Sequence, residues 1–282
     1  SRYASLWGDM GVVAEALGQA FAEAQDLDKA IDWYRKALAA TDGGASLKSV
    51  EQLGNLLARR GELRPDTDTH QAGQDIQTAL TRLQQLSDMQ PTPERYNLLG
   101  STWKRAAMLA SRDGDHQAER KALQQMAAHY GQAEDMEVGS GSGGIYYPAL
   151  NGMAAELRLA FLDQRQPDLS AGRLARVRDA LQTAAAQQPD FWCVAGQSEL
   201  LLLQSLAYGE LSRVAAGLVQ DLQALKVRVA APQMWASVYA QARFMLQPYL
   251  AQPGIANPAN AANRQAAESL LQALQALASS AP

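Results

Sequence analysis

Two neighbouring stretches near the start of the chain decide the fold: Glu15-Ala16-Leu17-Gly18-Gln19-Ala20-Phe21 and Asp28-Lys29-Ala30-Ile31-Asp32-Trp33-Tyr34-Arg35-Lys36-Ala37-Leu38. Apolar residues recur in both at helical spacing, which predicts two amphipathic helices joined by a short turn. Gly18 and Ala30 are small enough for the helices to cross closely, while Phe21 and Tyr34 can fill the space between repeats. The stretches therefore predict an antiparallel helix pair that buries its apolar faces against neighbouring pairs.

The spacing within this pair is that of the tetratricopeptide repeat. The match is carried by six residues: Leu17, Gly18, Phe21, Ala30, Tyr34 and Ala37. Looser copies begin at Leu53-Gly54, at Leu99-Gly100 and at Trp192. Residues of the same kinds continue into the second helices of the second and third copies, at Ala72, Ile76, Ala79, Tyr130 and Ala133. The sequence thus predicts a repeated unit and a fold built by stacking it.

Turn signals divide the chain into about twelve helical blocks, and strand-like alternation is absent. We predict an all-α fold, a tetratricopeptide-like α-solenoid of about six antiparallel helix pairs. Residues 1–251 form the solenoid, and residues 252–282 form a linker with a C-terminal capping helix that belongs to the same body. The Gly/Ser tract at 139–144 offers no packing residues and is typical of a flexible or engineered linker.

Composition excludes several classes of function. A net charge of −4 does not fit a general binder of nucleic-acid polymers, whose surface is strongly basic. The single cysteine, Cys193, permits no intramolecular disulfide and no cysteine-rich zinc site, which fits a reducing, cytoplasmic location. No apolar run is long enough to cross a bilayer. We therefore expect a soluble protein that works at neither a membrane nor a nucleic-acid polymer.

Catalytic and cofactor motifs are also missing from the sequence. The three histidines, His70, His116 and His129, are scattered and show no metal-ligand spacing. The tract at 139–144 lacks the Lys-Ser/Thr ending of a phosphate-binding loop, and no nucleophile elbow is present. We expect no catalytic residues, no metal and no cofactor, so the protein is not an enzyme by itself.

Polar residues form three stripes on the first helices of consecutive pairs. Residues spaced by three and four lie on one face of a helix. We expect the stripes to line the concave surface of the solenoid and to form one ligand-binding groove. Its candidate residues are Lys48, Gln52, Asn55 and Arg59 on the first stripe, Asn97, Ser101, Lys104 and Arg105 on the second, and Tyr147, Asn151 and Arg158 on the third.

The residue types in these stripes suit an anion with a polar or flat body. Lysine and arginine pair with phosphate or carboxylate, and amide side chains add directional hydrogen bonds. Tyr147 can stack on a ring. A polar stripe is also what the solvated face of any amphipathic helix looks like, so an ordinary wet surface stays an open interpretation.

Several segments of the chain resemble a known family, the tetratricopeptide-repeat sensor domain. This family also occurs in the central regulatory region of apoptosis signal-regulating kinases and in bacterial conflict and signalling proteins. The resemblance is carried by Glu51-Gln52-Leu53-Gly54-Asn55, Leu98-Leu99-Gly100-Ser101, Lys104-Arg105, Tyr146-Tyr147, Asn151 and Asp190-Phe191-Trp192. The chain departs from the family pattern after Trp192, where Cys193-Val194-Ala195-Gly196-Gln197 replaces an expected Thr-x-x-Glu.

The resemblance implies a regulatory domain of a larger signalling or defence protein. Such a domain would sense a nucleotide-derived small molecule and control a fused or neighbouring effector domain. The same groove would serve a second function equally well, as a peptide-binding adaptor that clamps a terminal carboxylate. The sequence leaves both alternatives open.

Overall fold

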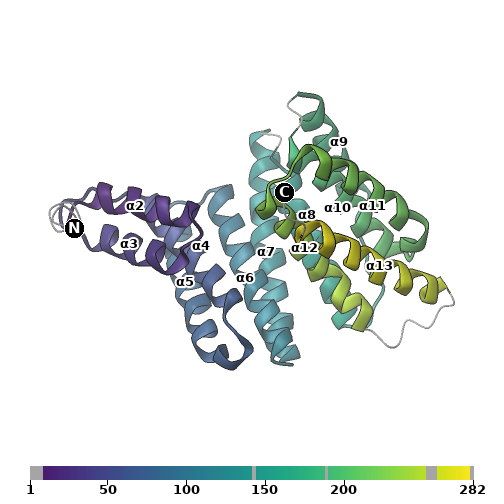
Figure 1. The fold of residues 1–282 in the computed structure, drawn as a ribbon, viewed down its shortest axis with the longest axis horizontal. Coiled ribbons are helices and arrows are strands. Elements are labelled where there is room, and N and C mark those ends of the chain that lie inside the picture. Colours follow the sequence, from purple (N-terminus) through teal and green to yellow (C-terminus); the bar gives the residue numbers. More distant parts are fainter. Residues whose placement is uncertain (1–8, 142–143, 188–189, 252–258, 280–282) are drawn as a thin grey trace. The chain divides into compact units, whose positions relative to one another are not determined.

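A computed structural model describes residues 9–141, 144–187, 190–251 and 259–279 of the chain. These residues form α-helices and one short 3-10 helix, and no strand occurs among them, which confirms the all-α prediction (Figure 1). The helices are α2 (Gly11–Glu23), α3 (Leu27–Ala39), α4 (Leu47–Leu63), η1 (Asp66–Asp68), α5 (Thr69–Met89), α6 (Pro93–Arg112), α7 (His116–Ser140), α8 (Tyr146–Leu162), α9 (Ala171–Gln187), α10 (Phe191–Tyr208), α11 (Leu211–Arg228), α12 (Pro232–Ala251) and α13 (Ala259–Ser279).

The twelve α-helices of the described residues follow one another as six pairs, as the repeat pattern predicts. The chain divides into two compact units, residues 1–133 and 134–282, and the boundary falls inside α7. The sequence-based boundary at residue 252 lies within the second unit. None of the described helices is long and apolar enough to cross a membrane.

In the first unit, each first helix meets its second helix at a glycine. A Cβ atom added to Gly18 would lie 2.9 Å from the Tyr34 ring, and one added to Gly100 would lie 2.7 Å from the Tyr130 ring. At Gly54, on α4, the neighbour is the side chain of Leu83, also at 2.7 Å. The repeat glycines are therefore required because a larger side chain would displace the residue that packs over them.

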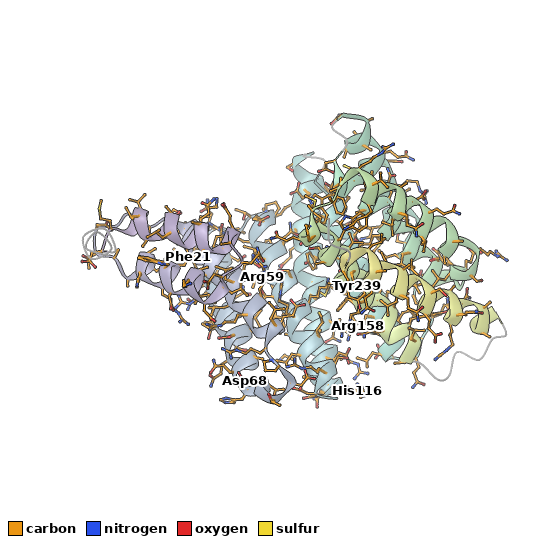
Figure 2. All side chains as sticks on the ribbon, viewed as in Figure 1. Phe21, Arg59, Asp68, His116, Arg158 and Tyr239 are labelled. Carbon is orange, nitrogen blue, oxygen red and sulfur yellow. The ribbon has the colours of Figure 1, made fainter. Side chains whose placement is uncertain are left out.

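Buried apolar side chains join successive pairs of the first unit. Tyr34 of α3 packs in one cluster with Leu53 and Leu57 of α4, and Phe21 of α2 lies against that cluster (Figure 2). Leu83 of α5 and Leu99 of α6 belong to the next cluster. Each residue of this kind loses most of its contact with water, which stabilises the fold by about 1.5–3 kcal/mol per side chain.

Helix ends in both units carry the expected signals. Thr92 caps α6 by accepting a hydrogen bond from the Arg95 amide at 3.2 Å, and Pro93 follows as the first helical residue. Asp190 caps α10 in the same way through the Cys193 amide at 2.8 Å. A side chain that accepts from these amides satisfies donors that the helix itself leaves unpaired.

Unit 2 is held together partly by its last helix. In α13, Ala267, Leu270 and Leu274 are buried, and the helix packs against α11 and α12. The fully buried Asn263 accepts from the Ser212 amide at 2.7 Å and donates to the Gly209 carbonyl at 2.7 Å. This one side chain therefore fastens α13 to the turn between α10 and α11.

Two segments differ from what the sequence predicts. Helix α7 extends through Gly139 to Ser140, so the first part of the Gly/Ser tract is helical, and residues 142–143 lie outside the described residues. Most of the expected linker, residues 252–258, also lies outside them. Trp192, at which a looser repeat copy begins, leaves 42% of its surface exposed while its ring meets Phe191 edge-on at 5.0 Å.

Candidate functional site

The first two polar stripes lie on neighbouring helices of the first unit, because α4 and α6 pack directly against each other. Along α4, Lys48 is exposed, while Gln52, Asn55 and Arg59 are half-buried. The buried Leu53, Leu56 and Leu57 occupy the opposite side of the same helix. The amphipathic spacing of α4 thus separates the polar stripe from the core as the sequence predicts.

Arg59 and Arg105 lie close enough across the α4–α6 contact to influence each other. Burial lowers the pKa of Arg59, the positive charge of Arg105 lowers it further, and the Glu62 carboxylate opposes this. Arg59 donates to Gln25 Oε1 at 2.9 Å, and Arg105 donates to Glu62 Oε2 at 2.9 Å. The surface therefore gathers two guanidinium groups around one carboxylate.

On α6, the four stripe residues Asn97, Ser101, Lys104 and Arg105 are half-buried. The Ser101 hydroxyl donates to the Leu98 carbonyl, and a second nitrogen of Arg105 donates to the Ser101 carbonyl, both at 3.0 Å. The bond from Arg105 to the helix's own backbone and its ion pair with Glu62 together orient the guanidinium along α6.

The Asn97 amide has an unmet hydrogen-bonding requirement. Its Oδ1 atom is buried and has no donor among the described residues. A buried acceptor without a partner costs about 1–3 kcal/mol. The oxygen is closed off from solvent, so a ligand N–H or O–H could reach it only after the neighbouring side chains shift.

Two charged groups that were not predicted from the sequence hold α4, α5 and α6 in register. Arg95, which is 5% exposed, donates to Glu51 at 2.8 Å and to the Gln90 carbonyl at 2.5 Å. Asp75 accepts from Arg60 and Arg64, at 2.8 Å and 3.0 Å. Burial would raise the pKa of Asp75, but these hydrogen bonds hold it below its usual value.

The signal for these groups is present in the sequence. Arg95 lies four residues before Leu99, and Asp75 lies three after Ala72, so each charge falls on the apolar face of its helix. A charge at such a position is almost never buried without a partner. Their role is structural: they orient the helices that carry the polar stripes.

The third stripe belongs to the second unit and has different surroundings. Asn151 and Arg158 of α8 are 8% and 5% exposed, whereas Tyr147 leaves 48% of its surface exposed. The Arg158 guanidinium lies 4.5 Å from the centre of the Phe244 ring and donates to the Phe244 carbonyl at 3.3 Å. Asn151 donates to the Tyr147 carbonyl at 3.0 Å.

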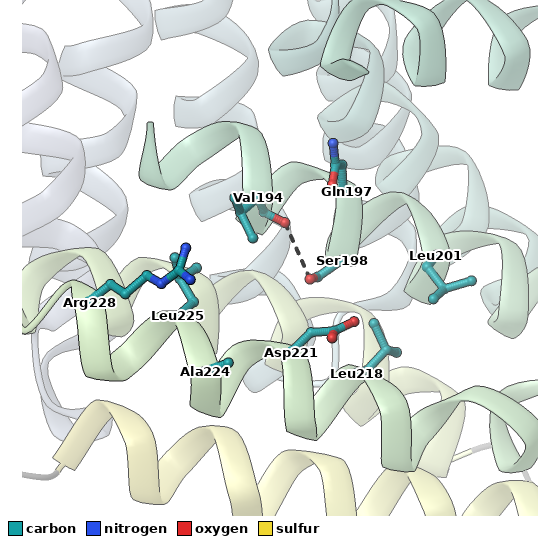
Figure 3. Close-up of a pocket in the computed structure, with 9 residues that line it drawn as sticks. All are labelled: Val194, Gln197, Ser198, Leu201, Leu218, Asp221, Ala224, Leu225 and Arg228. Atoms are coloured by element: carbon teal, nitrogen blue, oxygen red, sulfur yellow. Dashed lines mark hydrogen bonds between the residues drawn. The ribbon is translucent and has the colours of Figure 1, made fainter. Parts of the chain in front are cut away.

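A separate groove of about 420 Å³ runs between α10 and α11 of the second unit (Figure 3). It was not predicted from the sequence. Its walls mix apolar and polar side chains, and they consist of Val194, Gln197, Ser198, Leu201, Leu218, Asp221, Ala224, Leu225 and Arg228. Two sets of residues at helical spacing, one on each helix, produce it.

Within the described residues, no group of three or more His, Cys, Asp or Glu side chains could hold a metal ion. His129 is buried, stacks on Tyr96 and contacts Gln132 at 3.1 Å. The lone Cys193 is also buried, and burial together with the neighbouring Asp190 raises the pKa of its thiol.

A family model described as "Tetratricopeptide Repeats-Sensor" matches residues 26–156 of the chain. No curated protein matches the chain. The matched residues include the stripes on α4 and α6 and the beginning of α8, together with Gly54, Gly100 and the Arg95–Glu51 pair. The match over residues 26–156 supports the tetratricopeptide-repeat sensor family, which indicates a regulatory sensing domain.

Proposed function

We propose that the α4–α6 face binds an anionic, nucleotide-derived small molecule and that binding regulates an attached or neighbouring effector. The observation that carries this proposal is the pair of neighbouring guanidinium groups, Arg59 and Arg105, which have Glu62 as a nearby carboxylate. An arriving phosphate would relieve their mutual repulsion and accept charge-assisted hydrogen bonds from both.

The amide groups on the same face favour a ligand that also carries hydrogen-bond donors. Asn97 Oδ1 lacks a donor, and Asn55 and Gln52 are half-buried beside the two arginines. A nucleotide meets both requirements in one molecule, because its phosphates accept hydrogen bonds and its base and ribose donate them. In this proposal Lys48 and Lys104 add positive charge at the edge of the face, and Ser101 holds Arg105.

The residues of α8 belong to the second unit, and the proposal treats them separately from the α4–α6 face. Tyr147 is exposed at the start of α8, and its flat ring is proposed to stack on the ring of an aromatic ligand. Asn151 and Arg158 are buried, so in this proposal they act by holding α8 in position. The protein is proposed to be a non-catalytic cytoplasmic sensor in bacterial signalling or defence.

A peptide-binding adaptor is the second candidate function, and the same face favours it through different chemistry. A peptide with a free C-terminus presents a carboxylate for the arginines and backbone N–H groups for the amide oxygens. Both candidate functions therefore require an anionic group on the ligand. They differ in whether the rest of the ligand is a nucleotide or a peptide.

Calorimetry against a panel of nucleotides and a panel of peptides tests the proposal. The double variant Lys104→Ala/Arg105→Ala should weaken binding of the anionic ligand by several kcal/mol, since each charge-assisted hydrogen bond contributes about 1.5–3 kcal/mol. The matched control is Arg120→Ala/Lys121→Ala, which removes the same charge from α7 and should bind normally. Equal binding by all three proteins would remove the α4–α6 face from the proposal.

The variant Tyr147→Ala separates the classes of ligand. It should weaken binding of a molecule that carries a ring and leave a bare phosphate or simple carboxylate unaffected. Binding from the peptide panel without any from the nucleotide panel would favour the adaptor instead.

A further inference from the structure

Among the described residues, Glu62 is the carboxylate that forms an ion pair with an arginine of the α4–α6 face. It lies three residues after Arg59 in the last turn of α4, so both side chains share one side of that helix. Its Oε2 atom accepts a hydrogen bond from Arg105 Nε at 2.9 Å. Arg59 instead donates to the neutral side-chain amide of Gln25, also at 2.9 Å. The two arginines and Glu62 together therefore keep one positive charge that is not neutralised.

The ion pair between Glu62 and Arg105 is more exposed than the pair that joins the same two helices nearby. There the Arg95 side chain is 6% exposed and donates to Glu51 and to two oxygens of Gln90. The Glu62 side chain is 30% exposed and makes one hydrogen bond within the part of the chain that the structure describes. A carboxylate that is partly in water and has one bond leaves its partner at small cost.

Arg105 keeps a second attachment that does not depend on Glu62. Its Nη1 atom donates to the Ser101 carbonyl of its own helix at 3.0 Å. The guanidinium therefore stays directed along α6 when the carboxylate moves away. A guanidinium binds carboxylate and phosphate oxygens through the same charge-assisted hydrogen bonds. Glu62 thus occupies a position at Arg105 that an incoming anion requires.

We propose that Glu62 is an internal competitor, which an anionic ligand must displace from Arg105, and that this requirement selects a ligand with a terminal phosphate monoester. The inference rests on the proposed sensing function of the α4–α6 face. A monoanion, such as a carboxylate or a phosphodiester, would only replace one negative charge by another. A phosphate monoester carries a charge of about −1.5 to −2 at neutral pH and would neutralise Arg59 and Arg105 together.

Calorimetry with matched nucleotides tests the selection of a monoester. The probes are the 5′-monophosphates of the four common nucleosides and the methyl phosphodiester of each, which has one ionisable oxygen fewer. The wild-type chain should bind at least one monoester about tenfold or more tightly than its diester, because only the monoester gains charge neutralisation after Glu62 has left. Equal affinity for the monoester and the diester would overturn the selection.

The variant Glu62→Gln tests the competition itself. It keeps the shape of the side chain and removes its charge, so binding of both the monoester and the diester should tighten by about fivefold or more. Asp32→Asn is the matched control, because it removes one negative charge from an exposed ion pair with Arg35 on α3 and should bind as the wild type does. Equal tightening in both variants would reveal a general effect of net charge and overturn the competition. Weaker binding by Glu62→Gln would overturn it as well, since the carboxylate would then orient Arg105 for the ligand.

The double variant Lys104→Ala/Arg105→Ala separates this inference from the sensing function on which it rests. If the double variant loses nucleotide binding while the wild type binds monoester and diester equally, the sensing function stands and the role of Glu62 is refuted. If the double variant keeps the binding, or the wild type binds no nucleotide, both are refuted. Circular dichroism should show the same helix content in every variant.

Discussion

Helices α6 and α8 occupy equivalent places in successive pairs, yet they expose their polar residues very differently. In α6 the residues Asn97, Ser101, Lys104 and Arg105 are half-buried on one side of the helix. In α8 nearly every residue from Pro148 to Phe161 is buried, including Asn151 and Arg158. The same spacing of polar residues thus yields a reachable surface on one helix and a packed core on the other.

The cause lies in the residues around the stripe. Polar side chains fill one side of α6, so only the other side must be buried. In α8 the residues Met153, Ala155, Leu157 and Leu159 surround the helix on all sides, and a helix that is apolar all round is buried. The comparison teaches that a polar stripe predicts exposure only when the rest of the helix leaves a side uncovered.

The largest expected effect is that of Arg158→Ala. The change removes a guanidinium that packs over Phe244 and donates to its carbonyl, and it leaves a cavity. We expect the free energy of unfolding to fall by about 2–4 kcal/mol. Chemical denaturation measures this value. Substitutions at exposed positions change the free energy of unfolding by less than about 0.5 kcal/mol. A loss that small for Arg158→Ala would contradict the assignment of Arg158 to the packed core of α8.

The packing that positions α6 gives the next largest effect. Gly100→Ala places a methyl group against the Tyr130 ring and should lower the free energy of unfolding by about 1–3 kcal/mol. Gly131→Ala on α7 is the matched control, because nothing lies within 4 Å of the added Cβ. This control should raise stability by up to about 1 kcal/mol, since alanine favours the helix. If both variants changed the free energy of unfolding in the same direction, the result would contradict the close crossing of α6 and α7 at Gly100.

A smaller change in stability is expected for Arg105→Ala, the counterpart of Arg158→Ala on α6. Its ion pair with Glu62 is partly exposed, and such pairs contribute under about 1 kcal/mol. The melting temperature should therefore stay close to that of the wild type. A loss as large as that of Arg158→Ala would show that Arg105 serves the fold rather than a ligand.

The smallest effect is a dependence of stability on pH through His129, which stacks on Tyr96 of α6. Burial lowers the pKa of His129, and its hydrogen bond with Gln132 opposes this only in part. As the pH falls below about 6.5, the unfolded chain binds a proton at this histidine more readily than the folded chain does, so stability decreases. Denaturation at pH 7.5 and pH 5.5 should show the decrease in the wild type and a smaller one in His129→Gln.

The fold was predictable because the residues that define the repeat lie close together in the sequence. Gly18 and Tyr34 were recognised from their spacing as repeat positions, and in the structure Tyr34 packs over Gly18 itself, as Tyr130 packs over Gly100. Thr92 and Pro93 are residue types that favour the start of a helix, and α6 begins there. Contacts of this kind are local in sequence and follow from helix geometry alone.

The site was harder to predict because its electrostatics depend on contacts between distant residues. The Arg95–Glu51 pair joins positions 44 residues apart, and the burial of Arg158 depends on Phe244, 86 residues away. No spacing rule connects such residues. The groove between α10 and α11 was not predicted for the same reason, because its lining residues lie on two helices that come together only in the folded chain.

The most direct test of the central claim is to identify what the protein itself retains. The wild-type chain and the variant Lys104→Ala/Arg105→Ala are passed through an extract of the native host, recovered, denatured and examined by mass spectrometry. We predict that an anionic, nucleotide-derived molecule is released from the wild type in near-equal molar amount and is absent from the variant. Retention of the same molecule by both proteins, or release of a peptide in its place, would contradict the claim that the α4–α6 face binds a nucleotide-derived ligand.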